Sequence, residues 1–234
     1  MAKIFLIPTP LSPADLSPEL NRDVIDTLDY FVVENVRTAR RFLASLKLTR
    51  AIDDMQFIEL SEHTEPQDVE QMLSPILNEG RSCGVMSEAG LPCVADPGSL
   101  LVAAAHRHRL DIVPLVGGSS IMLALMGSGA DGQNFAFNGY LPIKPPERLA
   151  AIHRIERSAQ NGQSQIFIET PYRNLSLFAD LVKNCMKNTM LCVASDLTGS
   201  KMMIDSRKIE QWASGQSPLM AKIPTIFILF IEKG

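Results

Sequence analysis

Residues 85–98, with the sequence VMSEAGLPCVADPG, join an apolar run to the residue types that ligand-binding loops use. The segment holds two glycines, two prolines and two carboxylates, Glu88 and Asp96. Glycine lets a ligand approach the backbone closely, and proline stiffens the surrounding frame. In a chain of alternating strands and helices, the loop after a strand opens into the crevice where ligands bind. We therefore expect a ligand-binding loop here, although an ordinary strand-to-helix connection has a similar composition.

Individual side chains could carry acid–base or positioning roles. Glu88 could lie near a ligand or be a surface carboxylate bonded to backbone N–H groups. Asp96 precedes Pro97 and is better explained as a cap on the helix that follows. Glu169 ends an apolar run, where either a structural ion pair or a role as a cleft acid would satisfy a buried carboxylate. Tyr172 could orient an acceptor by hydrogen bonding, but its ordinary pKa of about 10 makes it a poor base at neutral pH.

The net charge of −4 sets limits on a nucleic-acid partner. Proteins that grip bare nucleic acid through many phosphates carry a basic excess, so RNA contact here needs a local basic patch or a substrate presented by a larger particle. Arginines on the polar side of one predicted helix are the best candidate, although a solvated helix face looks the same. They are Arg37, Arg40 and Arg41, with a weaker second group at Arg148, Arg154 and Arg157. Glu34 and Arg37 could also form an ion pair with each other.

The first half of the chain alternates strand and helix signals, which predicts a mainly parallel sheet with helices on both faces. The predicted strands are 4–7, 30–33, 57–60, 83–86 and 111–115. The predicted helices begin at Ser17, run over 36–46, run from 64 to 77 with Gly80 as the stop, and cover 100–105. These assignments rest on apolar spacings of three and four, capping hydroxyls and prolines in first turns.

The second half has a different pattern, with a short apolar helix over 121–126 after a Gly-Gly-Ser-Ser segment. A longer helix is predicted over 147–159, and strands are predicted at 165–169, 190–194, 202–204 and 226–231. The prediction is therefore an α/β chain of two domains. Residues 1–115 form the N-terminal domain with a mainly parallel sheet, and residues 116–234 form the C-terminal domain with a mixed sheet.

The chain carries no apolar run long enough to cross a bilayer, and its first residues read as a strand, too short for a signal peptide. We therefore expect a cytoplasmic protein with no membrane partner. The four cysteines form no C-x-x-C pair, so we expect reduced, mostly buried thiols. The histidines are scattered, and no metal site is expected.

Five motifs in order resemble those of the tetrapyrrole-methylase superfamily, and within it the branch of small-subunit ribosomal RNA (cytidine-2′-O) ribose methylases. The motifs are residues 87–92, 96–98, 113–120, 137–144 and 168–173. The match covers nearly the whole chain. It implies a two-domain methylase that uses S-adenosylmethionine, folded between the domains and held by several backbone loops in place of a single glycine-rich fingerprint. It also implies a homodimer.

Several positions depart from the ribose-methylase pattern. Thr9-Pro10 lacks the following Gly-Asn, Asn35 stands for Asp, Glu88 stands for Asp and Tyr172 stands for His. The late motif over residues 195–199 reads SDLTG and has lost both basic residues. Because these changes fall on substrate-side positions, three functions stay open. They are an RNA methyltransferase acting on a ribose 2′-hydroxyl, a methyltransferase of a small tetrapyrrole-like molecule, and a catalytically silent protein that binds cofactor or a partner.

The matched motifs imply a set of site residues in this chain. The catalytic or substrate-side candidates are Glu34, Arg37, Glu88, Lys144, Tyr172 and Arg173. The candidate cofactor contacts are Pro8, Ser87, Glu88, Ala89, Gly90, Pro92, Gly117, Ser119, Ser120, Tyr140, Leu141 and Thr198. The implied partners are S-adenosylmethionine, ribosomal RNA or the small ribosomal subunit, and a second copy of the chain.

Overall fold

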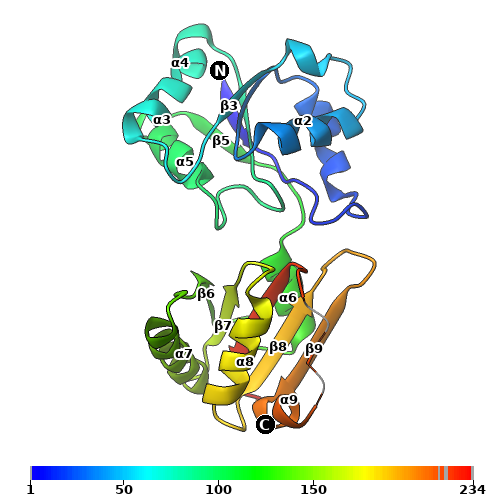
Figure 1. Cartoon of the computed structure of the whole chain (residues 1–234). Helices are drawn as coiled ribbons and strands as arrows, with labels where there is room; N and C mark the ends of the chain where they lie inside the picture. The colour runs from blue at the N-terminus through cyan, green and yellow to red at the C-terminus, as the bar shows by residue number, and fades with distance from the viewer. Residues whose placement is uncertain (1, 216, 219–220, 233–234) are drawn as a thin grey trace. The chain divides into compact units, whose positions relative to one another are not determined.

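The computed structural model describes residues 2–215, 217–218 and 221–232. The chain divides into two compact units, Met1–Ser119 and Ser120–Gly234 (Figure 1). Each unit is an α/β structure with its own sheet and its own apolar core, which confirms the predicted fold class.

The first unit is built on a five-stranded sheet in the order β3-β2-β4-β1-β5, with every neighbouring pair parallel. The strands are β1 (Lys3–Leu6), β2 (Tyr30–Val33), β3 (Gln56–Glu59), β4 (Cys83–Met86) and β5 (Asp111–Pro114). All residues of β2 and β4 are buried, as the central strands of a sheet covered on both faces must be. The predicted mainly parallel sheet is thus confirmed.

Helices cover both faces of this sheet (Figure 1). One layer packs around Leu73 and Leu101 and the other around Phe31 and Leu43. The first layer comprises α3 (Pro66–Met72), α4 (Ser74–Glu79) and α5 (Gly98–Arg107). The second comprises the 3-10 helix η1 (Ser17–Asn21), α1 (Arg22–Ile25), α2 (Val36–Ser45) and the 3-10 helix η2 (Ile52–Asp54).

The prediction of one continuous helix over 64–77 is wrong, because the chain breaks at Leu73 between α3 and α4. Pro75 has no N–H to continue the hydrogen-bond ladder, and its ring clashes with a carbonyl one turn earlier, so it can only begin a new helix. The predicted stop is confirmed, since Gly80 ends α4 in the left-handed conformation with φ +69.

The second unit has the predicted mixed sheet, and its five strands lie in the order β6-β7-β10-β8-β9. The strands are β6 (Phe135–Tyr140), β7 (Ser164–Ile168), β8 (Met190–Ser195), β9 (Met203–Lys208) and β10 (Thr225–Phe230). β6 is parallel to β7, whereas β10 is antiparallel to both β7 and β8. The carboxyl ends of β6, β7 and β8 therefore lie at one edge of the sheet, which we call the carboxyl edge, together with the amino end of β10.

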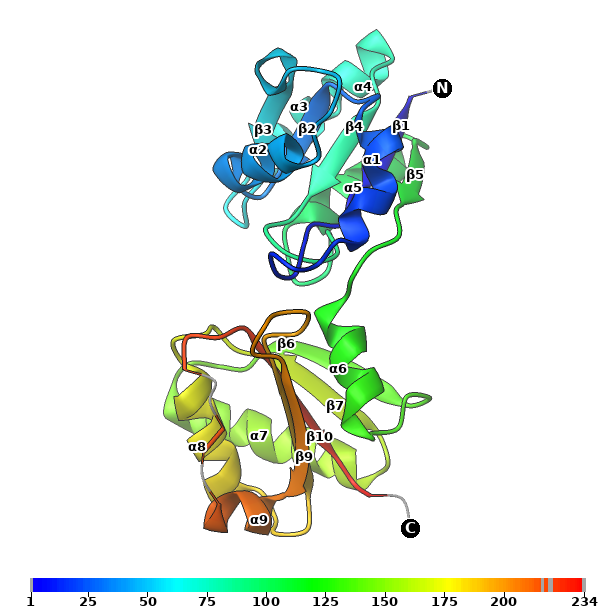
Figure 2. The same cartoon turned by 90° about the vertical axis from the view of Figure 1, so that its right-hand side faces the viewer.

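Helix α6 (Ser120–Ser128) covers one face of the second sheet, and the other three helices cover the opposite face (Figure 2). These three are α7 (Pro145–Gln160), α8 (Asn174–Asn184) and α9 (Ile209–Ser214). The sequence analysis missed α8 and α9, which bury Phe178 and Trp212 edge to face at 5.4 Å between ring centroids. Among the residues that the structure describes, no helix has the length and apolar character to span a membrane.

All four cysteines are free thiols, and three of them are buried, as predicted. Burial raises the pKa of Cys83 to about 12 and that of Cys192 to about 11. Both side chains therefore stay protonated at neutral pH and act as small apolar groups in the core.

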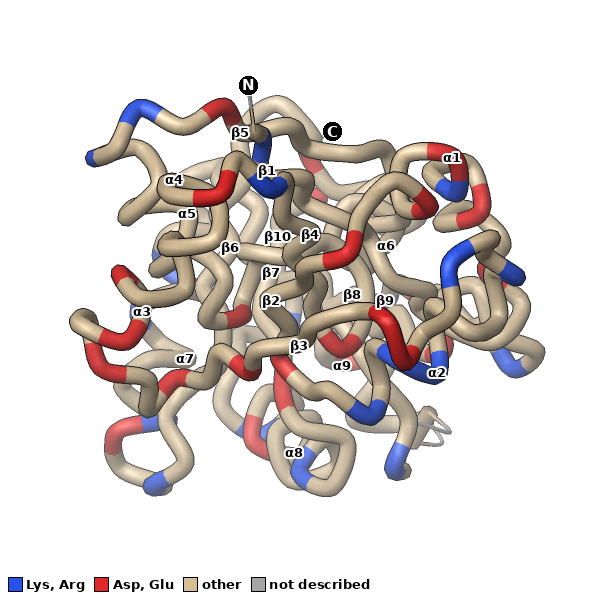
Figure 3. Tube along the Cα trace, turned by 90° about the horizontal axis from the view of Figure 1, so that it is seen from above, with Lys and Arg blue, Asp and Glu red and all other residues tan. Residues whose placement is uncertain are grey.

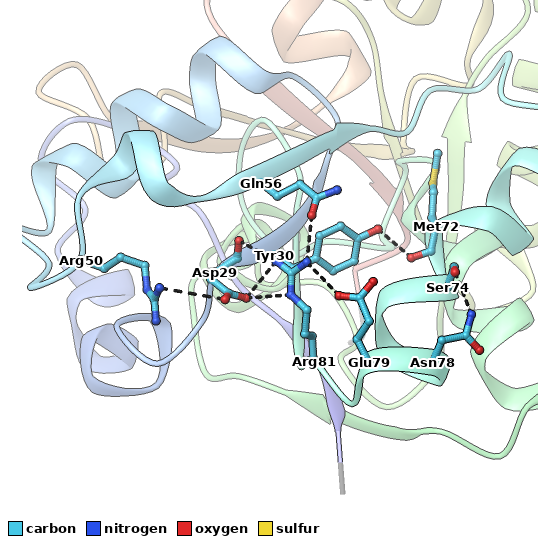
Figure 4. Close-up of polar contacts among 9 residues, drawn as sticks. All are labelled: Asp29, Tyr30, Arg50, Gln56, Met72, Ser74, Asn78, Glu79 and Arg81. Carbon is cyan, nitrogen blue, oxygen red and sulfur yellow. Dashed lines mark hydrogen bonds and ion pairs between the residues drawn. The ribbon is translucent and has the colours of Figure 1, made fainter.

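A polar cluster around Arg81 joins the amino ends of β2, β3 and β4 (Figure 4). The Arg81 guanidinium donates to an Asp29 carboxylate oxygen at 3.1 Å and to the Gln56 side-chain carbonyl at 2.9 Å. It also lies over the Tyr30 ring, with its central carbon 5.4 Å from the ring centroid. The Tyr30 hydroxyl donates to the Met72 carbonyl at 2.7 Å, which ties α3 to the sheet.

Replacing Arg81 by Met is expected to lower the free energy of unfolding of the first unit by about 2 kcal/mol, because charge-assisted hydrogen bonds and a cation–π contact are lost together. Arg50→Met is the matched control, since Arg50 reaches Asp29 only at 4.0 Å. Such an exposed pair contributes less than about 1 kcal/mol. Urea unfolding measures both variants, and equal losses would show that the cluster has no special stabilising role.

Candidate functional site

Three loops of the first unit meet beyond the carboxyl ends of β1, β4 and β5. Thr9 and Gly90 exchange two backbone hydrogen bonds, with N···O distances of 2.9 and 3.1 Å. The Thr9 hydroxyl donates to the Ser87 carbonyl at 3.3 Å. A Cβ at Gly117 would lie 2.2 Å from Cβ of Pro8, so the backbone at Gly117 packs directly on the proline ring. The structure thus brings together Pro8, residues 87–90 and Gly117, which the sequence motifs singled out separately.

The loop between β4 and α5 is held in a strained conformation. Gly90 has φ +78, and two residues with side chains, Cys93 and Ala95, have φ +68 and +62. For residues with a side chain, such conformations cost about 1–3 kcal/mol each and concentrate at functional sites, whereas glycine adopts them readily. Asp96 fixes the end of the loop, because its carboxylate accepts a hydrogen bond of 2.7 Å from the N–H of Gly98, the first residue of α5. The predicted capping role of Asp96 is confirmed.

Carboxylates from two neighbouring strand ends lie close together in the first unit. The side chain of Glu34, directly after β2, accepts a hydrogen bond of 2.9 Å from the backbone N–H of Glu88, which follows β4. Burial raises the pKa of Glu34, and the nearby charges of Asp96 and Glu88 raise it further, against the lowering effect of that hydrogen bond. Glu34 is half-buried and Glu88 is exposed. The pKa of Glu34 therefore lies above the ordinary value of a glutamate.

We expect Glu34→Gln to become more stabilising as the pH rises. The folded-state pKa of Glu34 lies above its ordinary value of 4.5, so the folded chain binds this proton more tightly than the unfolded chain does. The contribution of Glu34 to stability therefore falls as the pH rises through the folded-state pKa. Gln removes the titration and keeps an oxygen that can accept from Glu88. Unfolding midpoints of both proteins from about pH 4, below the ordinary pKa, up to about pH 8 measure the effect. A difference that stays constant over this range would contradict the assignment.

The first unit also contains a cavity of about 770 Å³, which the sequence analysis missed. It lies between the loop after β1, one side of α2 and the start of the β4–α5 loop. Small-molecule sites usually occupy about 300–1,000 Å³ and combine an apolar lining with a few polar groups, and this cavity fits that description. Its lining includes apolar Leu11, Leu16, Phe42 and Leu46 and polar Thr38, Arg41, Ser45 and Glu88.

Basic residues gather along α2, beside acidic residues of neighbouring loops (Figure 3). Arg37 is exposed and Arg41 lines the cavity, but Arg40 pairs with Asp53 and lies 5.6 Å from the Phe57 ring centroid. Arg40 is therefore committed to a structural contact, and the helix offers fewer available cations than its sequence indicates. Asn35, which stands where the motif has Asp, caps this helix by accepting from the N–H of Thr38 at 3.0 Å.

In the second unit, an ion pair marks the exit of β7 at the carboxyl edge. One oxygen of Glu169 accepts from Nε and Nη2 of Arg173 at 2.9 and 2.6 Å and from the backbone N–H of Thr170 at 2.6 Å. The Glu169 side chain is fully buried, and its other oxygen has no hydrogen-bond partner among the described residues. The hydrogen bonds to Glu169 raise the pKa of Arg173, whose side chain is 34% exposed. Of the two roles considered for Glu169, the structure shows the structural pair.

The loop between β8 and β9 is compact and strained at the same edge. Asp196 and Thr198 have φ +50 and +67, and a Cβ at Gly199 would lie 2.2 Å from the Asp196 carboxylate. That carboxylate accepts from the backbone N–H of Lys201 at 2.7 Å. The candidate residue Thr198 therefore lies at the carboxyl edge, where Tyr140 also ends β6.

The remaining candidates of the second unit differ in their surroundings. Tyr172 is 82% exposed, and Lys144 is exposed just before α7. Leu141 is buried in the core, so its side chain is unavailable and a ligand contact would come from its backbone. The weaker prediction for Arg148 as part of a solvent-facing basic group is wrong. Arg148 is buried, donates to the Ile143 carbonyl at 2.8 Å and pairs with Asp180 at 3.2 Å, which joins α7 to α8.

No family model matches the chain. Comparison with curated proteins finds relatives along most of its length. Ribosomal RNA small subunit methyltransferase I of Micromonospora olivasterospora is 32% identical over 179 residues, which cover 76% of this chain and 54% of the relative. The protein of the same name from Xylella fastidiosa is 30% identical over 196 residues, which cover 83% of this chain and 68% of the relative. The chain thus spans between about half and two thirds of the length of these relatives.

Solved structures of tetrapyrrole methyltransferases share the fold. The methyltransferase CobJ superposes with a TM-score of 0.64 at 17% identity, covering 99% of this chain and 95% of CobJ. Uroporphyrin III C-methyltransferase from Thermus thermophilus gives 0.58 at 13% identity, with 98% and 97% covered. At these identities the structures establish the architecture alone. The sequence relationship is closer, and by it this chain belongs to the family of ribosomal RNA small subunit methyltransferase I.

Proposed function

We propose that this chain is an S-adenosylmethionine-dependent methyltransferase that acts on RNA, with a ribose 2′-hydroxyl of small-subunit ribosomal RNA as the leading acceptor. The observation that carries the proposal is the meeting of three backbone loops at Pro8, Gly90 and Gly117, in a chain whose relatives bear that enzyme name. The matched region includes parts of both units of the chain, which supports a role for both in the proposed reaction.

The residues of the first unit fit the chemistry of the donor. Its sulfonium and ammonium groups favour carbonyl oxygens and carboxylates, and its adenosine needs a partly apolar slot with backbone partners. The Gly117–Pro8 contact leaves no room for a side chain, so the loop exposes backbone at this point. The proposed donor contacts in this unit are Pro8, Ser87, Glu88, Ala89, Gly90, Pro92, Gly117 and Ser119. Ser120, Tyr140, Leu141 and Thr198 are the proposed contacts from the second unit.

The bound donor supplies an activated methyl group, so the chain has to align the acceptor, exclude water and accept the hydroxyl proton. We propose that Arg173 and Lys144 contact phosphate groups of the acceptor, because both have positively charged side chains at the carboxyl edge. Tyr172 would orient the acceptor by a hydrogen bond. Glu34 accepts a hydrogen bond from the backbone N–H of Glu88 and so positions that loop. Glu34, Glu88 and Arg37 are the proposed catalytic or substrate-side residues of the first unit.

Calorimetric titration of the chain with S-adenosylmethionine tests donor binding directly. We expect saturable binding, and we expect thermal stability to rise with ligand concentration, by about 2.7 kcal/mol at about 100 times Kd. No heat and no thermal shift at millimolar ligand would overturn the proposal. Methyl transfer to a tetrapyrrole but not to RNA would show that the acceptor is a small molecule. Donor binding without transfer to either would indicate a catalytically silent member of the family.

Three further properties are part of the proposal. The chain would act in the cytoplasm as a homodimer. The boundary between its domains would fall between residues 115 and 116, just before the point at which the two compact units divide. Light scattering of the purified chain tests the dimer, for which a monomeric mass at micromolar concentration is the contrary result.

A further inference from the structure

Four connections of the second unit converge on the carboxyl edge. Three follow the carboxyl ends of β6, β7 and β8, and the fourth leads into the amino end of β10. The register places Thr225 opposite Ser195 and Ile226 opposite Ile168, so the entry to β10 lies beside the exits of β8 and β7. Figure 2 shows the orange β8–β9 loop and the red segment entering β10 at the same end of the unit.

Each of these connections contributes one cation, although the four lie far apart in the sequence. Lys144 follows β6, Arg173 follows β7, Lys201 lies between β8 and β9, and Lys222 precedes β10. The three lysines are exposed, and Arg173 is partly exposed. None of the three lysines takes part in an ion pair with another residue that the structure describes.

Hydrogen bonds tie the positions of these cations to one another. The backbone N–H of Lys222 donates to the Pro171 carbonyl at 3.2 Å, and the Asn174 amide donates to the Ile223 carbonyl at 2.7 Å. The segment of Lys222 is thus fastened to the turn that holds Arg173. Lys201 is fastened in the same way, through its backbone N–H, to the Asp196 carboxylate.

Acidic residues compensate part of the positive charge at this edge. Glu169 pairs with Arg173, and the Asp196 carboxylate accepts from the backbone N–H of Lys201. Glu147 is the exposed acid in the first turn of α7. The exposed side chains described at the edge therefore carry a net positive charge in a chain whose overall charge is −4. A local concentration of cations on an acidic protein is suited to a polyanion.

We propose that Lys144, Arg173, Lys201 and Lys222 form a basic edge that binds the phosphate backbone of RNA, with Lys201 and Lys222 as phosphate contacts. This inference rests on the proposed function and names the surface on which its substrate lies. The motif over residues 195–199 lacks the two basic residues of the ribose-methylase pattern. Lys201 and Lys222 restore two cations at the same sheet edge from different positions in the chain.

The test compares two double variants for binding to a short fluorescein-labelled single-stranded RNA over a range of salt concentrations. Lys201→Ala with Lys222→Ala removes half of the basic edge. The matched control, Lys183→Ala with Lys187→Ala, removes two exposed lysines near the carboxyl end of α8, at the opposite edge of the sheet. Calorimetry with S-adenosylmethionine accompanies each protein, so that loss of donor binding is seen separately from loss of RNA binding.

For the Lys201/Lys222 variant we expect weaker RNA binding, and a slope of log affinity against log salt that is shallower by about 1.4, since each lost contact to single-stranded RNA removes about 0.7. Donor affinity should stay unchanged, and the control variant should match the wild type in both measurements. Equal slopes in all three proteins would overturn the proposal that the basic edge binds RNA, but would not contradict the proposed methyltransferase function. An equal loss of binding to polyglutamate would also overturn it, since the edge would then be a general anion surface.

Discussion

Arg173→Met is expected to lower the free energy of unfolding of the second unit by about 3 kcal/mol and to abolish methyl transfer. The loss of stability follows from burial, because the variant leaves the fully buried carboxylate of Glu169 without its cation. The loss of activity follows from the proposed role of Arg173 as a phosphate contact. Denaturant unfolding and transfer of labelled methyl groups to RNA measure the two effects on the same preparation.

Two further variants separate the structural role of Arg173 from its role in acceptor binding. Glu169→Gln combined with Arg173→Met removes both charges, so most of the lost stability should return while methyl transfer stays absent. Arg173→Lys keeps the positive charge but loses the planar guanidinium that donates two hydrogen bonds to Glu169. Its RNA affinity should therefore lie between those of Arg173→Met and the wild type. If the double variant regained activity together with stability, Arg173 would have no part in acceptor binding.

Gly117→Ala is expected to disrupt the loop junction of the first unit and with it the binding of S-adenosylmethionine. The new methyl group would lie 2.2 Å from Cβ and 2.4 Å from Cγ of Pro8, and the ring of Pro8 cannot rotate away. Overpacking of this kind costs about 1–3 kcal/mol. A displacement that removes even 1.4 kcal/mol of binding free energy weakens affinity about tenfold. Calorimetry measures this loss of affinity, and urea unfolding measures the accompanying loss of stability.

Two other glycines, Gly118 and Gly132, supply the controls for Gly117→Ala. A Cβ at Gly118 would approach Asp15 and Leu11 at 3.2 Å, so Gly118→Ala should have a smaller effect that side-chain adjustment absorbs. A Cβ at Gly132 would meet no atom within 4 Å, and Gly132→Ala should bind the donor like the wild type. Unchanged donor affinity in Gly117→Ala would remove the loop junction from the donor site.

The central strands were readable from the sequence because both of their faces are buried. Residues 30–33 and 83–86 form continuous apolar runs between turn signals, and the structure has β2 and β4 over the same residues. Helix α8 was not predicted, although Leu177, Phe178 and Leu181 form an apolar stripe at helical spacing. Helix α9 spans six residues, which is too short for periodicity to be recognised, and its stability comes from burying Trp212.

Site residues that belong to sequence motifs could be predicted, whereas site residues that are brought together only by the tertiary fold could not. The motifs pointed to Pro8, Gly90 and Gly117 individually, and the parallel sheet brings them together. The burial of Arg148 depends on how α7 packs against α8, which local composition does not reveal. The gathering of Lys201 and Lys222 at one edge depends on the insertion of β10 between β7 and β8, which follows from the tertiary fold alone.

The most direct test of the methyltransferase assignment is transfer of an isotope-labelled methyl group from S-adenosylmethionine to small-subunit ribosomal RNA, followed by mass spectrometry of the nucleosides. We predict a ribose-methylated nucleoside with the wild-type chain and its absence with Arg173→Met, with the Glu169→Gln/Arg173→Met variant as the folded negative control. The account would be contradicted if the chain bound S-adenosylmethionine but transferred no label, either to RNA within small subunits or to free ribosomal RNA.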